Sequence, residues 1–493
     1  MTGSMRTRFS SIPLVALLSV AVAGCTVGPN FWRPSPDVPV AWSASALSST
    51  NSASQVSTAP TGDRARWWTS FKDDELNSLI DRAAGANLDA KEAVLRIAEA
   101  RAQRDISAAD QWPSLSVNAS GQVNRLSDTT PTGALFNKVG DFPGLTGISF
   151  PNPYDQYQLG FDASWEIDLF GRVRRSVEAA NANAQASLED SRQILISTFG
   201  DVGRAYIDLR GAQAKRAFTL DTVADAKELL DLAAQRRRAG LSPDIDVVRA
   251  AAEASSAEAL LPALDQQITV DINQLSKLLA REPGALRTEL ETARPIPPVP
   301  PVVPIGLPAD LARRRPDIRE AEARLHAATA QIGVAVADLY PRLTLGAQGG
   351  LQSETVAGLA NWASRIVTAG PTLELPIFDA GRRRGTVRLQ DIRAKEAALD
   401  YRRTVLSALQ ETENALAAYC TDQARGAALS RTVARNRDAL ALARLRYAAG
   451  VASFIDVLDA ERTAQQNELL LADSSTAVSI DLVVLYKALG GGW

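Results

Sequence analysis

The sequence predicts an α+β membrane protein with two internal repeats, in which four strands per chain form part of a β-barrel that long coiled-coil helices continue. Three observations predict this fold. Four segments alternate apolar and polar side chains with the two-residue period of a strand. Two long windows contain no proline and carry helical periodicity. Motifs of the first half recur in the second half at a constant offset.

The chain begins with the pattern of an export signal. Arg6 and Arg8 precede an apolar stretch at residues 12–23, which is too short to span a bilayer as a helix. Small residues then lead to Cys25, as in a bacterial lipobox, where the cysteine thiol receives a diacylglycerol. A cysteine that merely follows an ordinary cleavage site is the alternative. We expect removal of residues 1–24, a covalent lipid on Cys25 and no other cofactor.

The strand pattern is most regular at residues 157–169, where the apolar side chains from Tyr157 to Leu169 share one face. The same alternation predicts strands at 115–123, 343–352 and 367–377, the last one interrupted by two prolines. Each segment has the length that a tilted strand needs to cross a bilayer. A half-buried sheet of a soluble protein gives the same alternation, so both alternatives stay open here.

A single helix is predicted over residues 172–238. Leu188, Leu195, Val202 and Leu209 recur every seven residues, which is typical of helices that supercoil against neighbours. Such a helix spans on the order of 100 Å at 1.5 Å per residue. It cannot fold back into a compact core and needs equally long partners. No later segment offers 18 consecutive apolar residues, so we expect no transmembrane helix.

The second half of the chain repeats the first. The segment that starts at Ala239-Gly240 matches the one that starts at Ala449-Gly450, and Gly171 pairs with Gly381 at the same offset of 210 positions. The predicted organisation is a signal peptide at 1–24, an acylated N-terminus with a flexible tether at 25–62, a first repeat at 63–282, a proline-rich connector at 283–308 and a second repeat at 309–493.

Four strands are too few to seal a barrel. An open sheet edge in lipid leaves backbone donors and acceptors unpaired at several kcal/mol each, and common transmembrane barrels have about eight strands or more. The chain must therefore associate, and either two copies with eight strands or three copies with twelve satisfy the count. The helices then extend from one end of the barrel as a tube.

The composition excludes several function classes. A net charge of −3 and the lack of a basic run longer than three residues argue against nucleic-acid binding, and one His with two Cys leaves too little for a His/Cys metal site. His326 and Cys420 are expected to be structural. Glu166 and Asp168 share the polar face of a strand and are expected to line a wet lumen rather than form an acid/base pair. Without a glycine-rich phosphate loop, neither nucleotide use nor catalysis is expected.

Three stretches carry a family resemblance. Cys25 to Phe31, Arg313 to Glu322 and Tyr447 to Asp459 resemble segments of the outer-membrane efflux factors of the TolC superfamily, in the NodT-type lipoprotein branch of tripartite (RND-type) efflux systems. The resemblance covers essentially the whole chain after the signal. It implies a homotrimer with a twelve-stranded barrel in the outer membrane and an α-helical coiled-coil tunnel in the periplasm.

The resemblance also implies a function. The chain is expected to be a passive, gated exit duct for small molecules such as drugs or toxic compounds. Docking of a periplasmic adaptor and an inner-membrane transporter is expected to open its periplasmic tip, and the transporter supplies the energy. The expected non-protein partner is outer-membrane lipid, and no nucleic acid is expected to bind. Two alternatives remain, namely the same duct in type I protein secretion and a non-conducting structural coiled-coil lipoprotein.

The two tight turns at the ends of the long helices form the candidate site. Gly240 and Gly450 suit left-handed C-cap positions, and Ser242 is expected to cap a helix that starts at Pro243. At the closed end of a tube, three acids gather near the symmetry axis and focus a negative field. Ser453 and the first acid of the second turn also have capping-box spacing, so capping alone is the alternative. The three acids are Asp246, Asp456 and Asp459.

In the family, a tip tyrosine and a basic residue tie one repeat to the other. Tyr447 matches the tyrosine, and Asp246 is its expected partner. The basic position falls on Ala452 here. Either Arg446 or Arg249 is a substitute, and closure is expected to rely more on packing and hydrogen bonds.

Overall fold

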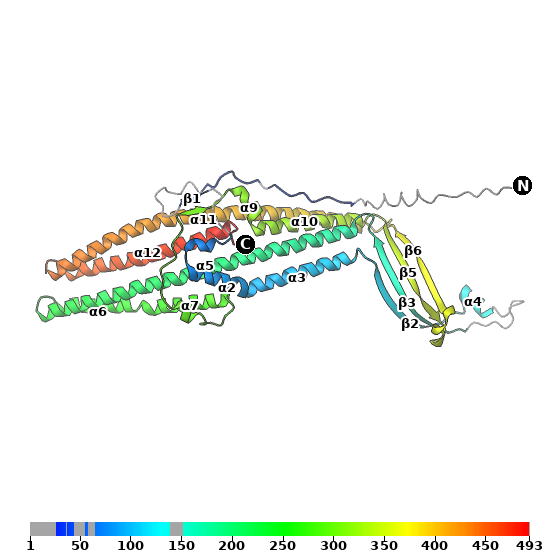
Figure 1. Ribbon diagram of the computed structural model, residues 1–493, viewed down its shortest axis with the longest axis horizontal. Helices are drawn as coiled ribbons and strands as arrows, with labels where there is room; N and C mark the ends of the chain where they lie inside the picture. The colour runs from blue at the N-terminus through cyan, green and yellow to red at the C-terminus, as the bar shows by residue number, and fades with distance from the viewer. Residues whose placement is uncertain (1–25, 36, 44–54, 58–64, 139–150, 493) are drawn as a thin grey trace. The chain divides into compact units, whose positions relative to one another are not determined.

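The computed structural model describes residues 26–35, 37–43, 55–57, 65–138 and 151–492, so the predicted signal peptide and Cys25 lie outside the described residues. Long helices and a group of strands make up this described part (Figure 1). The main strands are β2 (Ser114–Asn124), β3 (Tyr154–Ile167), β5 (Arg342–Ser353) and β6 (Arg365–Glu374). The main helices are α2 (Asp74–Ala86), α3 (Leu88–Ala109), α5 (Arg172–Arg238), α6 (Asp244–Glu258), α7 (Leu261–Leu278), α10 (Pro316–Ala337), α11 (Arg382–Ala448) and α12 (Phe454–Ala488).

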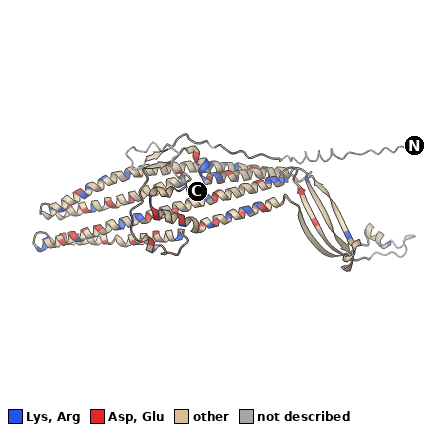
Figure 2. Ribbon diagram, in the orientation of Figure 1, with Lys and Arg blue, Asp and Glu red and all other residues tan. Residues whose placement is uncertain are grey.

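Charged residues are frequent along the helices and scarce on the strands (Figure 2). β2 contains none, and those of β5 and β6 are confined to the strand ends at Arg342, Arg365 and Glu374. Asp162 lies in the middle of β3, where its carboxylate accepts a hydrogen bond from the side-chain amide of Asn118 on β2. The strands therefore present almost no unpaired charge between their ends.

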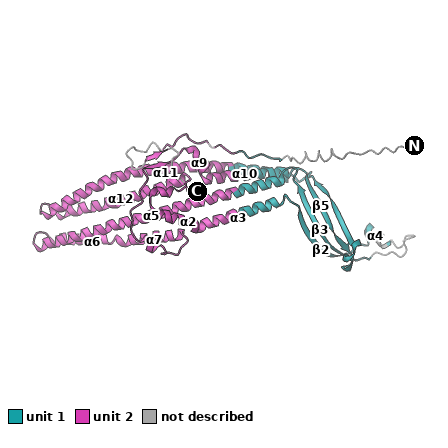
Figure 3. Ribbon diagram, viewed as in Figure 1, with its two compact units in different colours: residues 1–32, 100–184, 325–397 teal, residues 33–99, 185–324, 398–493 magenta. Residues whose placement is uncertain are grey.

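The chain divides into two compact units (Figure 3). Unit 1 comprises residues 1–32, 100–184 and 325–397 and contains the four main strands. Unit 2 comprises residues 33–99, 185–324 and 398–493 and is mostly helical.

The sheet of unit 1 has the strand order β2-β3-β5-β6, and every neighbouring pair is antiparallel. The four predicted strands are confirmed. The fourth is shorter than expected and ends at Glu374, before Pro376. Pro371 remains inside β6 because β6 is an edge strand of this sheet, where a residue without an N–H is tolerated.

The register places all predicted apolar rows on one face of the sheet. Val117 lies opposite Phe161, Phe161 opposite Gly349, and Gly349 opposite Val367. These side chains are not buried in the chain: Phe161 is 56% exposed and Val367 is 80% exposed. The other face carries Ser, Thr, Asn and Gln side chains. The alternation of a soluble half-buried sheet would instead have packed the apolar face against a core.

The predicted helix over residues 172–238 is confirmed at both ends by α5, and α11 has the same length of 67 residues. In unit 2, α5 turns back into α6 and α11 turns back into α12, and the two hairpin turns lie at the same end of this unit (Figure 1). Side chains from all four helices meet there in one apolar cluster.

The returning helices of the two hairpins differ. In the first hairpin the helix is interrupted between Glu258 and Leu261, and α7 starts with Pro262 in its first turn. A proline cannot donate to the carbonyl four residues earlier, so it ends the preceding helix. The position 210 residues later is Ala472, and α12 continues through it without interruption.

A second apolar cluster forms the main core of unit 2. It draws buried side chains from α2, α5, α7, α11 and α12 and from the short 3-10 helix η2 (Trp67–Phe71). Trp67 stacks on Tyr486 of α12 with 5.7 Å between ring centroids. Aromatic side chains contribute large buried areas to such a core, so η2 fixes the end of α12 against the long helices.

Among the described residues, α12 is long and apolar enough to pass for a membrane span by length and composition, with a mean hydropathy of 1.6 over its best window. Asp473 and Asp481 interrupt the apolar residues in the second half of α12, which is why the sequence pattern did not indicate a span. Core helices pass the same criterion. Leu482, Leu485 and Tyr486 of α12 are buried in the main core, so we describe α12 as a helix of unit 2.

A buried ion pair joins α2 to α5. The guanidinium of Arg210 is fully buried and donates to Glu75 and, at 2.9 Å, to the backbone carbonyl of Thr292. Tyr206 donates its hydroxyl to Asp73 at 2.8 Å. Removing one member of such a network would leave a buried charge without a partner, so these bonds fix the connector to the first long helix.

The connector is irregular, as predicted, apart from short elements. β4 (Val302–Pro304) pairs in parallel with β1 (Gln55–Ser57), and Trp42 donates its indole N–H to the carbonyl of Gly306 at 2.9 Å. Residues 55–57 of the predicted flexible tether, together with Trp42, are therefore held against the connector, which corrects the expectation for residues 55–57. The remaining short elements are α4 (Pro131–Lys138), α8 (Arg287–Leu290), α9 (Pro308–Arg314), η4 (Ala357–Ala360) and η5 (Trp362–Ser364).

The segment that follows the predicted lipobox is packed into unit 1. Gly28 has a φ of +87°, and an added Cβ would lie 2.5 Å from the Cα of Gly333 on α10. His326 contacts a carboxylate oxygen of Glu178 at 2.9 Å and stacks on Phe31. The structural role expected for His326 is confirmed, since it holds the N-terminal segment to α5 and α10.

Candidate functional site

Both hairpin turns close in the same way. Gly240 and Gly450 have φ values of +72° and +76°, so the predicted left-handed C-caps are confirmed. The N–H groups of Gly240 and Leu241 donate to the carbonyls of Arg237 and Arg236, and the second turn repeats this pair of bonds. This is a Schellman motif, which satisfies the last carbonyls of each long helix.

The helix starts after the turns differ. Ser242 was expected to cap the first returning helix, but Pro243 is the extended N-cap residue and the helix begins at Asp244, so this prediction is wrong by one position. In the second turn Ser453 is the N-cap, and its N–H donates to a carboxylate oxygen of Asp456 at 3.0 Å. The acid of the expected capping box is therefore in place. Asp456 and Asp459 are exposed in the chain.

Tyr447 lies at the centre of the cluster where the four helices meet. It is 3% exposed and contacts Phe454 edge to face, with 5.4 Å between ring centroids. The other buried members are Leu229, Ala233, Ala250, Val457 and Leu458. Burial raises the pKa of Tyr447, and the carboxylate of Asp246 raises it further, whereas Arg236 lowers it. The tyrosine therefore stays neutral and holds the two hairpins together by apolar packing.

Asp246 is brought to Tyr447, as expected, and is 9% exposed. Within the described residues, no hydrogen bond joins its carboxylate to the tyrosine hydroxyl. Asp246 therefore acts on Tyr447 through its charge and not through a hydrogen bond.

The basic residue of the tip is Arg236, which the sequence patterns did not single out. Its Nη1 donates to the carbonyls of Tyr447 and Ala448 at 2.8 and 3.1 Å, and its guanidinium lies 4.8 Å from the centroid of the Tyr447 ring. Arg446 and Arg249, the expected substitutes, are both exposed. The usable signal was the run of three arginines in the last turn of α5, where cations are favoured and can reach a neighbouring helix end.

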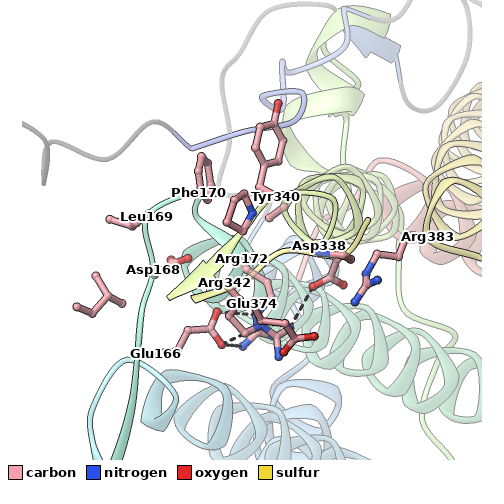
Figure 4. Close-up of a pocket in the computed structure, with 14 residues that line it drawn as sticks. Glu166, Asp168, Leu169, Phe170, Arg172, Asp338, Tyr340, Arg342, Glu374 and Arg383 are labelled. Carbon is pink, nitrogen blue, oxygen red and sulfur yellow. Dashed lines mark hydrogen bonds and ion pairs between the residues drawn. The ribbon is translucent and has the colours of Figure 1, made fainter. Parts of the chain in front are cut away.

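A second polar site lies within unit 1 where the strands meet the long helices (Figure 4). Arg172 donates to both carboxylate oxygens of Glu166, at 2.9 and 2.8 Å, and Arg342 lies 3.6 Å from the same carboxylate. Asp168 accepts from the backbone and side chain of Arg174 at 2.8 and 3.2 Å. Glu166 and Asp168 therefore fix the strand-to-helix junction, each with its own arginine.

The comparisons with known proteins cover nearly the whole chain. A family model described as outer membrane efflux protein matches residues 79–281 and 307–491. The chain belongs to the outer membrane efflux protein family. Outer membrane protein OprJ of Pseudomonas aeruginosa is 32% identical over 477 residues, which cover 97% of this chain and 95% of OprJ. The solvent efflux pump outer membrane protein SrpC of Pseudomonas putida is 32% identical, with 99% of each chain covered.

Another relative and two solved structures are similar over most of the chain. Nodulation protein T of Rhizobium leguminosarum bv. trifolii is 30% identical, with 96% of each chain covered. Among solved structures, the outer-membrane channel OprN is similar with a TM-score of 0.85 at 33% identity, over 95% of this chain and all of OprN. CusC is similar with a TM-score of 0.79 at 26% identity. The protein is accordingly an outer-membrane efflux channel with a periplasmic helical portion.

Proposed function

We propose that three copies of the chain form a twelve-stranded barrel in the outer membrane, continued by a coiled-coil tunnel, and that this duct releases small molecules from a tripartite efflux pump. One observation carries the proposal. The four-stranded sheet has an exposed apolar face, a polar opposite face and an unpaired edge at each of β2 and β6. Lipid suits the apolar face, and only pairing with neighbouring copies removes the edges.

Three copies suit the function better than two. The interior of an eight-stranded barrel is about filled by side chains, whereas wider barrels enclose an aqueous lumen. The polar face of the sheet is rich in Ser, Thr, Asn and Gln side chains, which suit such a lumen.

The assembly and the duct can be tested together. Purified full-length protein in detergent should have the native mass of a trimer, and in a planar bilayer it should give discrete conductance steps. A monomer without conductance would overturn the proposal and favour the structural lipoprotein. A trimer that never conducts, even with both Asp456→Asn and Asp459→Asn, would do the same.

We further propose that the hairpin tips are the periplasmic gate. In a trimer the exposed carboxylates of Asp456 and Asp459 form stacked acidic rings in the narrow end of the tunnel. Tyr447, Asp246 and Arg236 hold the two hairpins of one chain together. Neutralising the rings with the double Asn variant should reduce the preference for cations over anions, measured as the reversal potential in a salt gradient. An unchanged reversal potential would remove both acids from the pore.

The partners proposed are a periplasmic adaptor and an inner-membrane transporter, because relatives of this chain are named as outer membrane proteins of efflux pumps. The turns expose Leu241 and Val451. A photo-crosslinking amino acid at either position should capture the adaptor in cells. The same amino acid at Leu399, an exposed residue in the first third of α11 and far from the turn, should not. Equal capture at all three positions would contradict docking at the tip.

The cargo is proposed to be small molecules chosen by the partner pump. Relatives over the whole chain are named for solvent, toluene and cation efflux, so one duct architecture serves chemically different cargo. Deleting the gene should raise susceptibility to toxic organic compounds. A deletion that instead abolishes export of a protein, with susceptibility unchanged, would favour type I secretion.

We also propose that Cys25 carries the lipid of the mature N-terminus. The neighbouring residues from Thr26 onward are held against α5 and α10, and the backbone N–H of Val27 donates to the carbonyl of Phe170 at 3.1 Å. Labelling with a fatty-acid probe should mark the wild type and not Cys25→Ser. Labelling that survives this substitution would reject the assignment.

A further inference from the structure

A group of charged side chains joins the hairpins about one helical turn from the apolar cluster at the tip. Arg444 on α11 donates through Nη2 to a carboxylate oxygen of Asp225 on α5 at 2.9 Å and to one of Glu461 on α12 at 3.4 Å. Nearby, Arg462 on α12 contacts Glu253 on α6 at 2.7 Å. These two arginines therefore link the first hairpin to the second in two places.

The charges of this group do not balance. Asp225, Glu253 and Glu461 face Arg444 and Arg462, which leaves an excess of one negative charge when all are ionised. The excess falls on Glu461. It is 3% exposed, and within the described part of the chain its Oε2 has no hydrogen-bond partner. A buried carboxylate oxygen without a donor is costly.

Space for water lies beside this carboxylate. A cavity of about 270 Å³ is lined by residues of α5, α11 and α12, among them Asp225, Arg444 and Glu461. Glu468 and Arg437 form a separate ion pair of 2.6 Å in the wall of the same cavity. Oε2 of Glu461 is nevertheless shielded from solvent in this arrangement, so a movement of α12 away from α5 and α11 would increase the hydration of the ionised carboxylate.

We propose that Glu461 is a proton-controlled clasp of the gate: its neutral form leaves the ion pair of Arg444 and Asp225 to hold the two hairpins together, and its ionised form favours their separation by repelling the acids of the first hairpin. This inference rests on the proposed gated duct. Arg444 lies about one helical turn before Tyr447 on α11, and the clasp does not use the acids of the predicted pore rings.

The direction of the pH dependence follows from the burial of Glu461. Burial in the closed arrangement raises its pKa, Arg444 lowers it, and Asp225 and Glu253 raise it further. In a hydrated, open arrangement the pKa returns toward its ordinary value. The closed state therefore binds the proton more tightly, so low pH stabilises closure and closure weakens as the pH rises.

The test compares Glu461→Gln with the wild type in planar bilayers. The open probability of the wild-type trimer should rise several-fold from about pH 5 to about pH 8. Glu461→Gln, which keeps the shape and loses the charge, should stay mostly closed across this range. Glu468→Gln is the control. Glu468 lines the same cavity but is paired with Arg437, so this variant should keep the wild-type pH response.

A second measurement separates this inference from the proposed function. Spin labels at the exposed Val248 of α6 and Leu442 of α11, with Cys420 replaced by Ala, report the distance between the hairpins. That distance should increase with pH in the wild type and not in Glu461→Gln. An unchanged pH response in a conducting Glu461→Gln trimer overturns the clasp and leaves the duct intact. Loss of conductance in every variant and in the wild type overturns the duct itself.

Discussion

The two hairpins of the chain have the same turn and different neighbours. Each long helix has 67 residues and ends in a Schellman motif at a glycine. Asp246 and Asp456 occupy the same position, third in the returning helix, 210 residues apart. Asp246 is buried beside Tyr447, whereas Asp456 is exposed and accepts a hydrogen bond from the N-cap of its own helix.

The residues across the turn explain this difference. Tyr447 in the second hairpin corresponds to Arg237 in the first, which forms an ion pair with Asp244 at the start of α6. The aromatic ring covers the tip of the other hairpin, and the arginine closes only its own turn. The sequence repeat therefore fixes the local backbone of both turns. A few side chains decide that the second hairpin supplies the aromatic ring and that the first hairpin is covered by it.

The largest expected effect comes from making the two returning helices alike. Ala472→Pro introduces into α12 the proline that interrupts the first hairpin at Pro262. It should destabilise the protein by about 3 kcal/mol or more, because it removes a helical hydrogen bond and its ring clashes with the preceding turn. Thermal unfolding measures the loss. Ala472→Ser is the control and should cost much less, and an equal loss in both variants would show that burial of Ala472, rather than helix continuity, matters.

The next effect concerns the link between the hairpins. Arg236→Ala removes two charge-assisted hydrogen bonds to the end of α11 and the contact with the Tyr447 ring. The closed tip should lose about 1–3 kcal/mol, so basal conductance should rise by about tenfold. Arg446→Ala, at the equivalent position of the other hairpin, removes an exposed side chain and should change little. Equal leakage in both variants would contradict the assignment of Arg236.

A pH-dependent effect compares the two returning helices. Burial raises the pKa of Asp271 on α7 to about 6, and Asp208 adds to the shift, while Gln267 and Lys215 oppose it. Asp481, 210 positions later, also has a raised pKa because of burial and the neighbouring Asp422. Each raised pKa means that the folded state binds the proton more tightly, so stability falls as the pH rises through the folded pKa.

Asp271→Asn should therefore stabilise the protein by about 2 kcal/mol near pH 8 and bring no gain near pH 4. Thermal unfolding across this pH range measures the difference. Asp265→Asn changes an exposed acid of the same helix, which is paired with Arg216, and should not reproduce it. A gain that is independent of pH would show that the charge of Asp271 is not the cause.

The smallest effect separates the two equivalent acids. Asp456→Ala removes the acceptor for the N–H of Ser453 and should cost about 1 kcal/mol, seen as faster amide hydrogen exchange in the first turn of α12. Asp246→Ala removes no capping bond and should leave exchange at the start of α6 nearly unchanged. Similar acceleration in both helices would mean that the helix dipole, rather than the cap, governs both acids.

Much of the fold was predictable because it depends on short-range patterns. The two-residue alternation gave all four strands of the sheet, and the helical periodicity within a proline-free window gave α5. The glycines gave both turns, since a left-handed C-cap excludes most other residues. The strand ends were less accurate because pairing, not alternation, decides where β6 stops.

The site was predicted only in part. Tyr447 and Asp246 were found through the resemblance, and their proximity agrees with it. Arg236 was missed because its partner atoms are backbone carbonyls 211 positions away, which no motif records. The cap predicted at Ser242 shifted to Pro243 because the extended backbone before the helix suited the proline. The pairing of Asp225, Arg444 and Glu461 joins three helices and has no trace in any one of them.

The sequence by itself determined the secondary structure, the duplicated hairpins and the family, because periodicity and turn residues act over a few neighbouring positions. The tertiary structure decided which of two equivalent acids is buried, which arginine reaches Tyr447 and which carboxylate is left without a partner. These outcomes depend on side chains brought together from distant helices, where burial and charge are set by neighbours that the local sequence does not contain.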